Sequence, residues 1–485
     1  MAAYDQLHVF FFPMMAQGHM IPTLDLAKLF ASRGVRATII TTPRNQHVFS
    51  DSIVKATQLG GRIQIVVLDF PAVQAGLPEG CERLDLAPDD LVPNFHAACA
   101  MLQEPLEQLL QQHRPDCLVA DMFFPWATDA AAKFHVPRLV FHGVSYIALC
   151  AWYNLRVHDP FKNVSSDCEP VPIPNLPHDI RLTRLQLSPV DRGLLDSYSG
   201  ELMKQVRESD VASYGVIFNS FYELEREYAD YYTNILGIKA WPVGPLSLRI
   251  NAESRAERGD KPSMDEHQCL KWLDSKAPNS IVYICFGSGM ASFAPNQLRE
   301  LAVGIESSGL GFVWVIRKGR DEEAENNNEK WMPEGFEERT KERGLVIRGW
   351  APQVVILDHQ AVGAFVTHCG WNSTLEGVCA GVPFVTWPMC AEQFYNEKLV
   401  TEVLKTGVGV GSKKWMRSGN DGVESAAIAE AMKRVMMVES EELRSRAKAY
   451  KEMAKKAIEE GGSSYCGLTA LLDELTTLHH SSRKH

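Results

Sequence analysis

Two polar residues stand where apolar runs in the first third of the chain end. His19 follows the run 7–12 across a short loop, and Asp121 closes the run 117–120. A histidine can accept a proton at neutral pH, and a carboxylate beside it can fix its tautomer and stabilise its charge. The pair therefore predicts general-base chemistry, although a histidine in a loop and an aspartate after a strand are each, taken alone, more often structural.

A second group of residues that could bind a ligand lies in 350–393, a stretch of 44 residues without Lys or Arg. It opens on Trp350 and ends on a Glu-Gln pair, and residues 372–376 between them have the S-x-x-E spacing of a helix capping box. The free amides of a helix start bind anions without a cationic side chain. The stretch therefore favours a sugar-nucleotide site with the diphosphate at the helix start.

Apolar strands that alternate with helices must position these residues. The strands expected in the first half are 7–12, 35–41, 117–120 and 138–141, and those expected in the second half are 281–286, 311–316, 345–347, 363–367 and 382–386. One helix is expected to start near Pro22, and another spans 127–134. This alternation predicts parallel sheets covered on both faces, which bind ligands at the carboxyl ends of their strands.

The alternating pattern breaks around residues 241–245, and a polar, charged stretch follows. A chain of 485 residues also exceeds what one hydrophobic core usually supports. We therefore predict an N-terminal domain over 1–245, a linker over 246–268, a C-terminal domain over 269–455 and a terminal helical segment over 456–485.

The composition excludes several partners. With a net charge of −11, the chain lacks the basic footprint that nucleic acid or an anionic membrane requires. Its 11 cysteines form no C-x-x-C pair, which fits a reducing cytosol. The N-terminus lacks the basic region of a signal peptide, and no apolar run reaches the roughly 18 residues of a membrane span. We expect a cytoplasmic monomer.

Residues 350–393 resemble the signature box of plant secondary-product glycosyltransferases, which use uridine-diphosphate sugars. The resemblance implies an α/β fold of two facing Rossmann-like doubly wound domains (GT-B type), with the acceptor in the first domain and the UDP-sugar in the second. It also implies that the last helices return to the first domain. The co-substrate would be UDP-glucose, with no cofactor.

The same resemblance assigns donor contacts. It implies that Trp350 stacks on uracil, Ala351 meets the edge of the base, Gln353 and Glu376 bind the ribose hydroxyls, and His368, Asn372 and Ser373 hold the phosphates. A further phosphate ligand is expected at Ser288, in the turn after the first strand of the second domain. In that family Trp371 and the final pair, here Glu392 and Gln393, face the hexose, and glutamine at the last position accompanies glucose.

Residues 16–22 (AQGHMIP) and 119–121 (VAD) resemble the base loop and the orienting aspartate of that family. The resemblance implies that His19 is the general base and Asp121 its orienter. The predicted reaction is a single in-line displacement at the anomeric carbon, which turns an α-linked donor into a β-glucoside. No D-x-D motif occurs in the chain, so a metal-bridged diphosphate is not expected.

The acceptor is less defined by the sequence. Phe123 and Phe124 are candidates to face a planar or polycyclic apolar molecule. Aromatic residues at such positions pack in the core about as often, so both interpretations stay open. Residues 10–13, 19–23, 163–167 and 173–177 resemble the subgroup that acts on flavonoids, triterpenoids and steroidal aglycones. Neither the acceptor nor the hydroxyl attacked follows from these residues.

Two functions of other classes stay open. A nicotinamide oxidoreductase uses the same kind of sheet, but the glycine pair 287 and 289 is not completed, because Ser292 holds the third glycine position. A catalytically silent sugar-nucleotide sensor would lack the base, and His19 is present.

Overall fold

The structure, a computed structural model, describes residues 4–194, 197–249, 258–259, 263–264, 266–287, 292–316 and 328–482. Contacts divide the chain into two compact units. The first consists of Met1–Ser145, Gly193–Asn251 and Lys456–His485, and the second of Tyr146–Arg192 and Ala252–Lys455. Residues 146–192, placed by the sequence in the N-terminal domain, thus cluster with the second unit.

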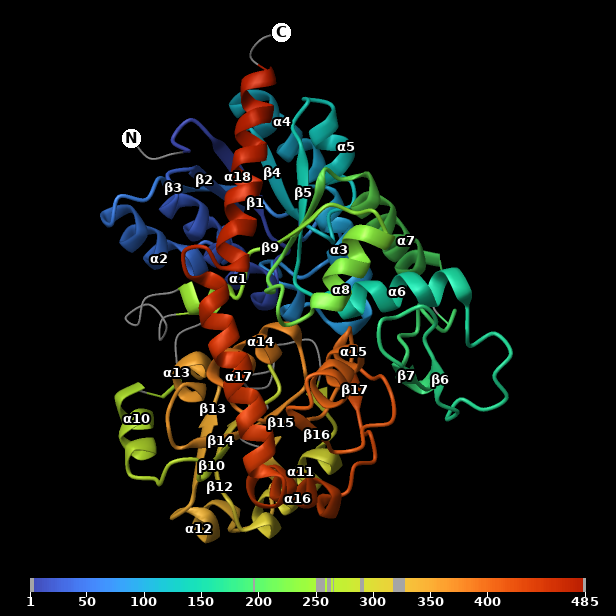
Figure 1. Cartoon of the computed structure of the whole chain (residues 1–485), viewed down its shortest axis with the longest axis vertical. Helices are drawn as coiled ribbons and strands as arrows, with labels where there is room; N and C mark the ends of the chain where they lie inside the picture. Colours follow the sequence, from blue (N-terminus) through green and yellow to red (C-terminus); the bar gives the residue numbers. More distant parts are fainter. Residues whose placement is uncertain are drawn as a thin grey trace. The chain divides into compact units, whose positions relative to one another are not determined.

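The first unit is built on a parallel sheet in the order β3-β2-β1-β4-β5-β8-β9 (Figure 1). Its strands are β1 (His8–Phe12), β2 (Arg36–Thr41), β3 (Ile63–Val67), β4 (Cys117–Asp121), β5 (Arg138–His142), β8 (Gly215–Phe218) and β9 (Ala240–Pro242). Its helices are α1 (Gln17–Ser32), α2 (His47–Gln58), α3 (Val92–Ala100), α4 (Gln103–His113), α5 (Ala127–Ala132), α7 (Ser197–Ala212), α8 (Arg226–Asp230) and α18 (Ser463–Ser482).

Side chains of β1 alternate between two cores, as a strand covered on both faces requires. Val9 and Phe11 pack with α1, α2 and α18, and α18 is the red helix drawn across this sheet in Figure 1. Phe10 and Phe12 pack with α3, α4 and α5 on the other face. The terminal helix is therefore part of the first unit's core.

The second unit has a parallel sheet in the order β13-β12-β10-β14-β15-β16. Its strands are β10 (Ile281–Cys285), β12 (Gly311–Ile316), β13 (Gly344–Arg348), β14 (Val362–Thr367), β15 (Phe384–Thr386) and β16 (Gly407–Gly409). Short strand pairs join β6 (Val171–Pro172) to β7 (Arg181–Leu182) and β11 (Ser292–Phe293) to β17 (Ser418–Gly419). The helices are α6 (Tyr146–His158), α10 (Glu266–Asp274), α11 (Pro295–Ser308), α12 (Phe336–Thr340), α13 (Gln353–Leu357), α14 (Trp371–Ala380), α15 (Gln393–Lys398), α16 (Ser425–Lys433) and α17 (Ser440–Ile458).

These two units confirm the predicted α/β class, with a doubly wound sheet in each. In both sheets the strand order reverses next to the first strand of the sheet, between β1 and β4 and between β10 and β14. Connections leave such a switch point in opposite directions, which opens a crevice at the carboxyl ends of the two strands. The fold therefore predicts one ligand-binding edge in each unit.

The start of α1 differs from the prediction, which placed Gly18 and His19 in a loop and Pro22 in the first turn. The helix begins at Gln17, because the carbonyl of Ala16 accepts hydrogen bonds from the amides of His19 and Met20, both at 2.9 Å. Pro22 lies inside the helix. His19 is thereby fixed in a helical first turn.

Among the helices of the described residues, none has the length and apolar character needed to cross a bilayer. Within the same residues, no group of three or more His, Cys, Asp or Glu side chains is arranged to hold a metal ion.

Candidate active site

The switch point of the first sheet brings His19 and Asp121 together. The side chain of His19, in the first turn of α1, is 16% exposed, and that of Asp121, at the end of β4, is 2% exposed. His19 Nδ1 lies 2.7 Å from Asp121 Oδ2. A carboxylate accepts this bond, so Nδ1 carries the proton and Nε2 is the ring nitrogen suited to act as a base.

Asp121 is held in its ionised form. Burial raises its pKa, but the charge of His19, the bond to His19, and the backbone amides of Phe123 and Met14 together outweigh burial and lower the pKa from 3.8. The Phe123 amide donates to Oδ1 at 3.1 Å. Each carboxylate oxygen of Asp121 therefore has a fixed partner, and the imidazole is oriented by a charged acceptor.

The surroundings of the dyad separate the two candidate aromatic residues. Phe123 is partly buried, and its ring centroid lies 5.8 Å from that of His19. Phe124 is fully buried and stacks on Phe12 at 4.3 Å. Phe124 thus packs in the core, whereas Phe123 lies beside the dyad.

In the second unit, the predicted ribose residues form one hydrogen-bonded cluster. Gln353, at the start of α13, donates through Nε2 to Glu376 Oε2 at 2.7 Å and to Ser373 Oγ at 3.1 Å. The hydroxyl of Tyr283 on β10 donates to Gln353 Oε1 at 3.4 Å. A core strand therefore helps to orient the cluster.

Sequence reasoning missed three residues that contact the predicted donor residues Glu376 and Trp350. Arg258 forms an ion pair with Glu376, and their side chains are only 11% and 6% exposed. Gly259 lies against the indole of Trp350, since a Cβ built on it would stand 2.1 Å from Cζ2. Ser263 exchanges two 2.9 Å hydrogen bonds with the backbone of Trp350. In the sequence these three residues belong to a polar, charged stretch, and this composition does not indicate which residues they contact.

His368 follows β14 at the second switch point and lies between two glycines. A Cβ on Gly287, after β10, would stand 2.6 Å from its Cε1, and one on Gly370 would stand 2.5 Å from its Nε2. Gly287 also has a positive φ of 76°. Glycine at both positions therefore makes room for the imidazole at the carboxyl edge of the sheet.

The capping-box prediction for residues 372–376 is wrong. The N-cap of α14 is Gly370, with no side-chain cap, so Ser373 and Glu376 lie inside the helix. The amide of Trp371 instead donates to Glu392 Oε1 at 3.3 Å, and Asn396 also donates to that oxygen, at 3.2 Å.

The other predicted donor residues are placed as follows. Gln393 Oε1 accepts hydrogen bonds from the amides of Met389 and Cys390, both at 2.9 Å. Ala351 is buried next to Trp350, and Asn372 is partly buried in the first turn of α14. Ser288 lies outside the described residues. The described members thus gather at the carboxyl edge of the second sheet, in the segments that follow β13, β14 and β15.

Comparisons with known proteins all identify glycosyltransferases as the relatives of this chain. The model of "UDP-glucoronosyl and UDP-glucosyl transferase" matches residues 227–440, and that of "Glycosyltransferase, N-terminal domain" matches residues 5–248. A scopoletin glucosyltransferase of Nicotiana tabacum is 63% identical over 99% of this chain and 100% of its own length. An anthocyanin 3'-O-beta-glucosyltransferase of Gentiana triflora is 54% identical over 98% and 100%.

Solved structures agree as well. The crystal structure of Glycyrrhiza uralensis UGT73P12, complexed with glycyrrhetinic acid 3-O-monoglucuronide, matches with a TM-score of 0.90. It is 41% identical in sequence, and the match covers 99% of this chain and 97% of that one.

Proposed function

This chain belongs to the UDP-glycosyltransferase family, and from that premise we propose that it moves glucose from UDP-glucose to a hydroxyl group of a small apolar plant secondary metabolite, a flavonoid or a triterpenoid or steroid. The enzyme is a UDP-sugar-dependent hexosyltransferase, with the donor as co-substrate. The observation that carries the reaction type is the 2.7 Å contact between His19 and Asp121.

The dyad supports an inverting transfer. His19 Nε2 takes the proton of the acceptor hydroxyl as the oxygen bonds to the anomeric carbon, and the bond between that carbon and the diphosphate oxygen breaks with its electron pair leaving on UDP. Asp121 stabilises the imidazolium that results. Attack opposite an α-linked leaving group gives a β-glucoside.

We assign the donor to the edge of the second sheet. Trp350 offers an aromatic face to uracil with Ala351 at the edge of the base, and Gln353 and Glu376 offer hydrogen bonds to the ribose. The diphosphate is assigned to His368, Asn372, Ser373 and Ser288, and the hexose to Trp371, Glu392 and Gln393. The first turn of α14, with its positive dipole end, supports the phosphate assignment.

The acceptor site is proposed around Phe123, which lies beside the base. The names of the relatives, with scopoletin and anthocyanin among their acceptors, support a planar aromatic class for this chain. The triterpenoid in the structural relative supports the polycyclic class. We further propose a cytoplasmic monomer without a cofactor, with residues 1–245 serving the acceptor and 269–455 the donor.

The function is tested by measuring UDP released from UDP-glucose with a panel of flavonoids, coumarins and triterpenoids. Stoichiometric UDP and β-glucoside with at least one acceptor is the expected result. UDP-glucose binding without turnover on any acceptor would instead favour a sugar-nucleotide sensor.

Transfer should continue in a chelator. Because the donor assignment uses helix amides and neutral side chains for the diphosphate, we expect initial rates in excess EDTA to stay within about twofold of the untreated rate. Rates restored only by added Mg²⁺ or Mn²⁺ would contradict the metal-independent assignment.

Changing Arg258 to alanine should tighten UDP binding. Glu376 forms an ion pair with the guanidinium of Arg258 and is also the residue that we assign to the ribose hydroxyls. The nucleotide must therefore break this partly buried ion pair before it binds. We expect the Kd of UDP, measured by calorimetry, to fall about fivefold, which corresponds to about 1 kcal/mol. Arg339→Ala removes an ion pair with Glu306 elsewhere in the unit and should leave the Kd unchanged. Weaker binding in Arg258→Ala would make this arginine part of the donor site instead.

A further inference from the structure

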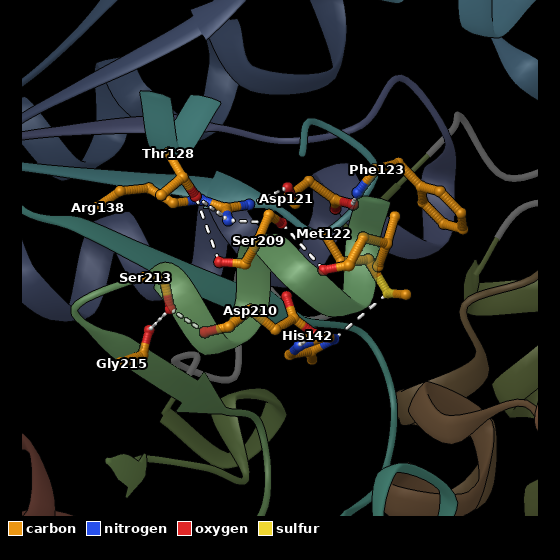
Figure 2. A network of polar contacts seen from close by, with 11 residues as sticks. Asp121, Met122, Phe123, Thr128, Arg138, His142, Ser209, Asp210, Ser213 and Gly215 are labelled. Atoms are coloured by element: carbon orange, nitrogen blue, oxygen red, sulfur yellow. Dashed lines mark hydrogen bonds and ion pairs between the residues drawn. The ribbon is translucent and has the colours of Figure 1, made fainter. Parts of the chain in front are cut away.

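A layer of polar side chains lies behind Asp121, between β5 and α7 (Figure 2). Arg138 and His142 project from the same face of β5, because they are four residues apart in a strand. Helix α7 supplies Ser209 and Asp210 to this layer, and Asp210 Oδ2 lies 3.0 Å from His142 Nε2. The dyad therefore has a charged layer directly beneath it.

Arg138 joins three elements in that layer. Its Nη2 donates to the backbone carbonyl of Asp121 at 2.9 Å. Its Nη1 donates to Thr128 Oγ1 on α5 at 2.9 Å and to Ser209 Oγ on α7 at 3.2 Å. Figure 2 shows the side chain extending from β5 toward Asp121, with these partners around its end. The end of β4 is thus tied to two helices through one guanidinium.

Packing alone does not account for a cation at this position. Arg138 is 2% exposed, and its Nε is buried with no hydrogen-bond partner among the described residues. Burial lowers the pKa of Arg138 to about 10, against the opposing charges of Asp210 and Asp121, so the group remains charged at neutral pH. An apolar side chain of similar size often replaces a buried charge without loss of stability. The three hydrogen bonds of the guanidinium, rather than packing, therefore account better for a cation at this position.

We propose that Arg138 is a positioning residue for the His19–Asp121 dyad, acting through the carbonyl of Asp121. The inference rests on the proposed function, because it assumes that His19 is the base. The guanidinium fixes the backbone from which the Asp121 carboxylate projects, and its positive charge favours the ionised carboxylate that stabilises the imidazolium. A shift of about 1 Å at a catalytic group can lower a rate by up to about 100-fold, so such an anchor has kinetic consequences.

Several titratable groups lie near the Asp121 carboxylate. Besides Arg138, the titratable groups of the described residues that interact with Asp121 include His19 on α1 and Cys99 on α3. His142 on β5 and Asp210 on α7 complete the layer. Arg138 is the only one of these that stays positively charged at all pH values up to about 10. Its removal should therefore favour the protonated form of the carboxylate.

The test compares Arg138→Gln and Arg138→Lys with wild type in the full-length enzyme. For Arg138→Gln we expect kcat to fall about tenfold, the Kd of UDP to stay within twofold, and the acid limb of the kcat/KM profile to move to higher pH. Arg138→Lys keeps the positive charge but lacks the branched guanidinium that reaches three acceptors. The acid limb should therefore return to its wild-type position, while kcat recovers only in part.

Ser213→Ala is the matched control, because the Ser213 hydroxyl donates to the carbonyls of Asp210 and Gly215 at the end of α7, and neither bond involves Arg138. It should lower the Tm with turnover and acid limb unchanged. If Arg138→Gln behaves like this control, with a lower Tm alone, the proposal is overturned.

If Arg138→Gln fails to fold, Arg138→Lys decides, since a compact ammonium cannot span the Asp121 carbonyl and both hydroxyls. A wild-type kcat in Arg138→Lys would then overturn the proposal, and a severalfold lower kcat with unchanged Kd for UDP would support it. Failure of the proposed function is distinguishable, because a fully active His19→Ala enzyme would remove the base itself. An inactive His19→Ala enzyme with wild-type turnover in both Arg138 variants would overturn this inference alone.

Discussion

Replacing His19 by alanine should lower kcat for glucosyl transfer by about 1,000-fold at neutral pH, because a positioned general base contributes roughly 100- to 10,000-fold. UDP binding should be unchanged, since the proposed donor residues belong to the other unit. The test measures UDP release under saturating donor and acceptor, and calorimetry gives the Kd of UDP for the same preparation. The expected result is a loss of turnover with an unaltered Kd.

His158→Ala serves as the histidine control for this experiment. His158 is exposed at the end of α6, where its ring contacts Asn175, and it has no part in the proposed chemistry. Its loss should leave kcat within twofold. Near-normal turnover in His19→Ala, with the control also active, would show that the acceptor proton is removed by another group.

Much of the architecture was predictable because parallel strands that are buried on both faces are nearly continuous apolar runs. The run 311–316 is GFVWVI, and β12 has the same bounds, with its four central residues buried. A strand covered on both faces must be apolar at successive positions, so the signal is local and survives without any tertiary information. The same applies to β4 and β5, which the sequence placed within one residue at each end.

The relative placement of elements was not predictable from local pattern. The residues near His19 and Asp121 do not indicate that β1 and β4 are neighbours, since about 100 residues separate the two strands. The resemblance of short motifs supplied the pairing of His19 with Asp121 as an expectation. The structure adds the physical reason, which is that both residues lie at the switch point of the sheet.

Side-chain partners at the second site were also beyond local pattern. The S-x-x-E spacing at 373–376 correctly marked a helix but misplaced its start, because the turn after β14 is already closed by Gly370 and because Glu392, remote in sequence, accepts the Trp371 amide. The pairing of Arg258 with Glu376 joins residues 118 apart. Neither contact has a spacing rule, so only the folded chain reveals them.

Changing Asp121 to asparagine should reduce kcat about as severely as removing the base, although the change replaces one oxygen by one nitrogen. The amide of Phe123 donates to Oδ1, so the asparagine oxygen must take that position to keep the bond. Its NH₂ group then faces His19 Nδ1, which can accept that bond only when the ring proton is on Nε2. The base would carry a proton at the nitrogen that must accept one, and we expect kcat to fall about 1,000- to 10,000-fold.

Stability gives an independent measurement of the same change. The native pKa of Asp121 is lowered from 3.8, so the folded state binds the proton more weakly than the unfolded chain does. The resulting stabilisation is present above about pH 4 and is lost as the pH falls through the lower native pKa. The difference in unfolding free energy between wild type and Asp121→Asn should therefore be largest near neutral pH and shrink in acid. A difference that is constant with pH, together with full turnover, would mean that the Asp121 charge neither stabilises the fold nor orients His19.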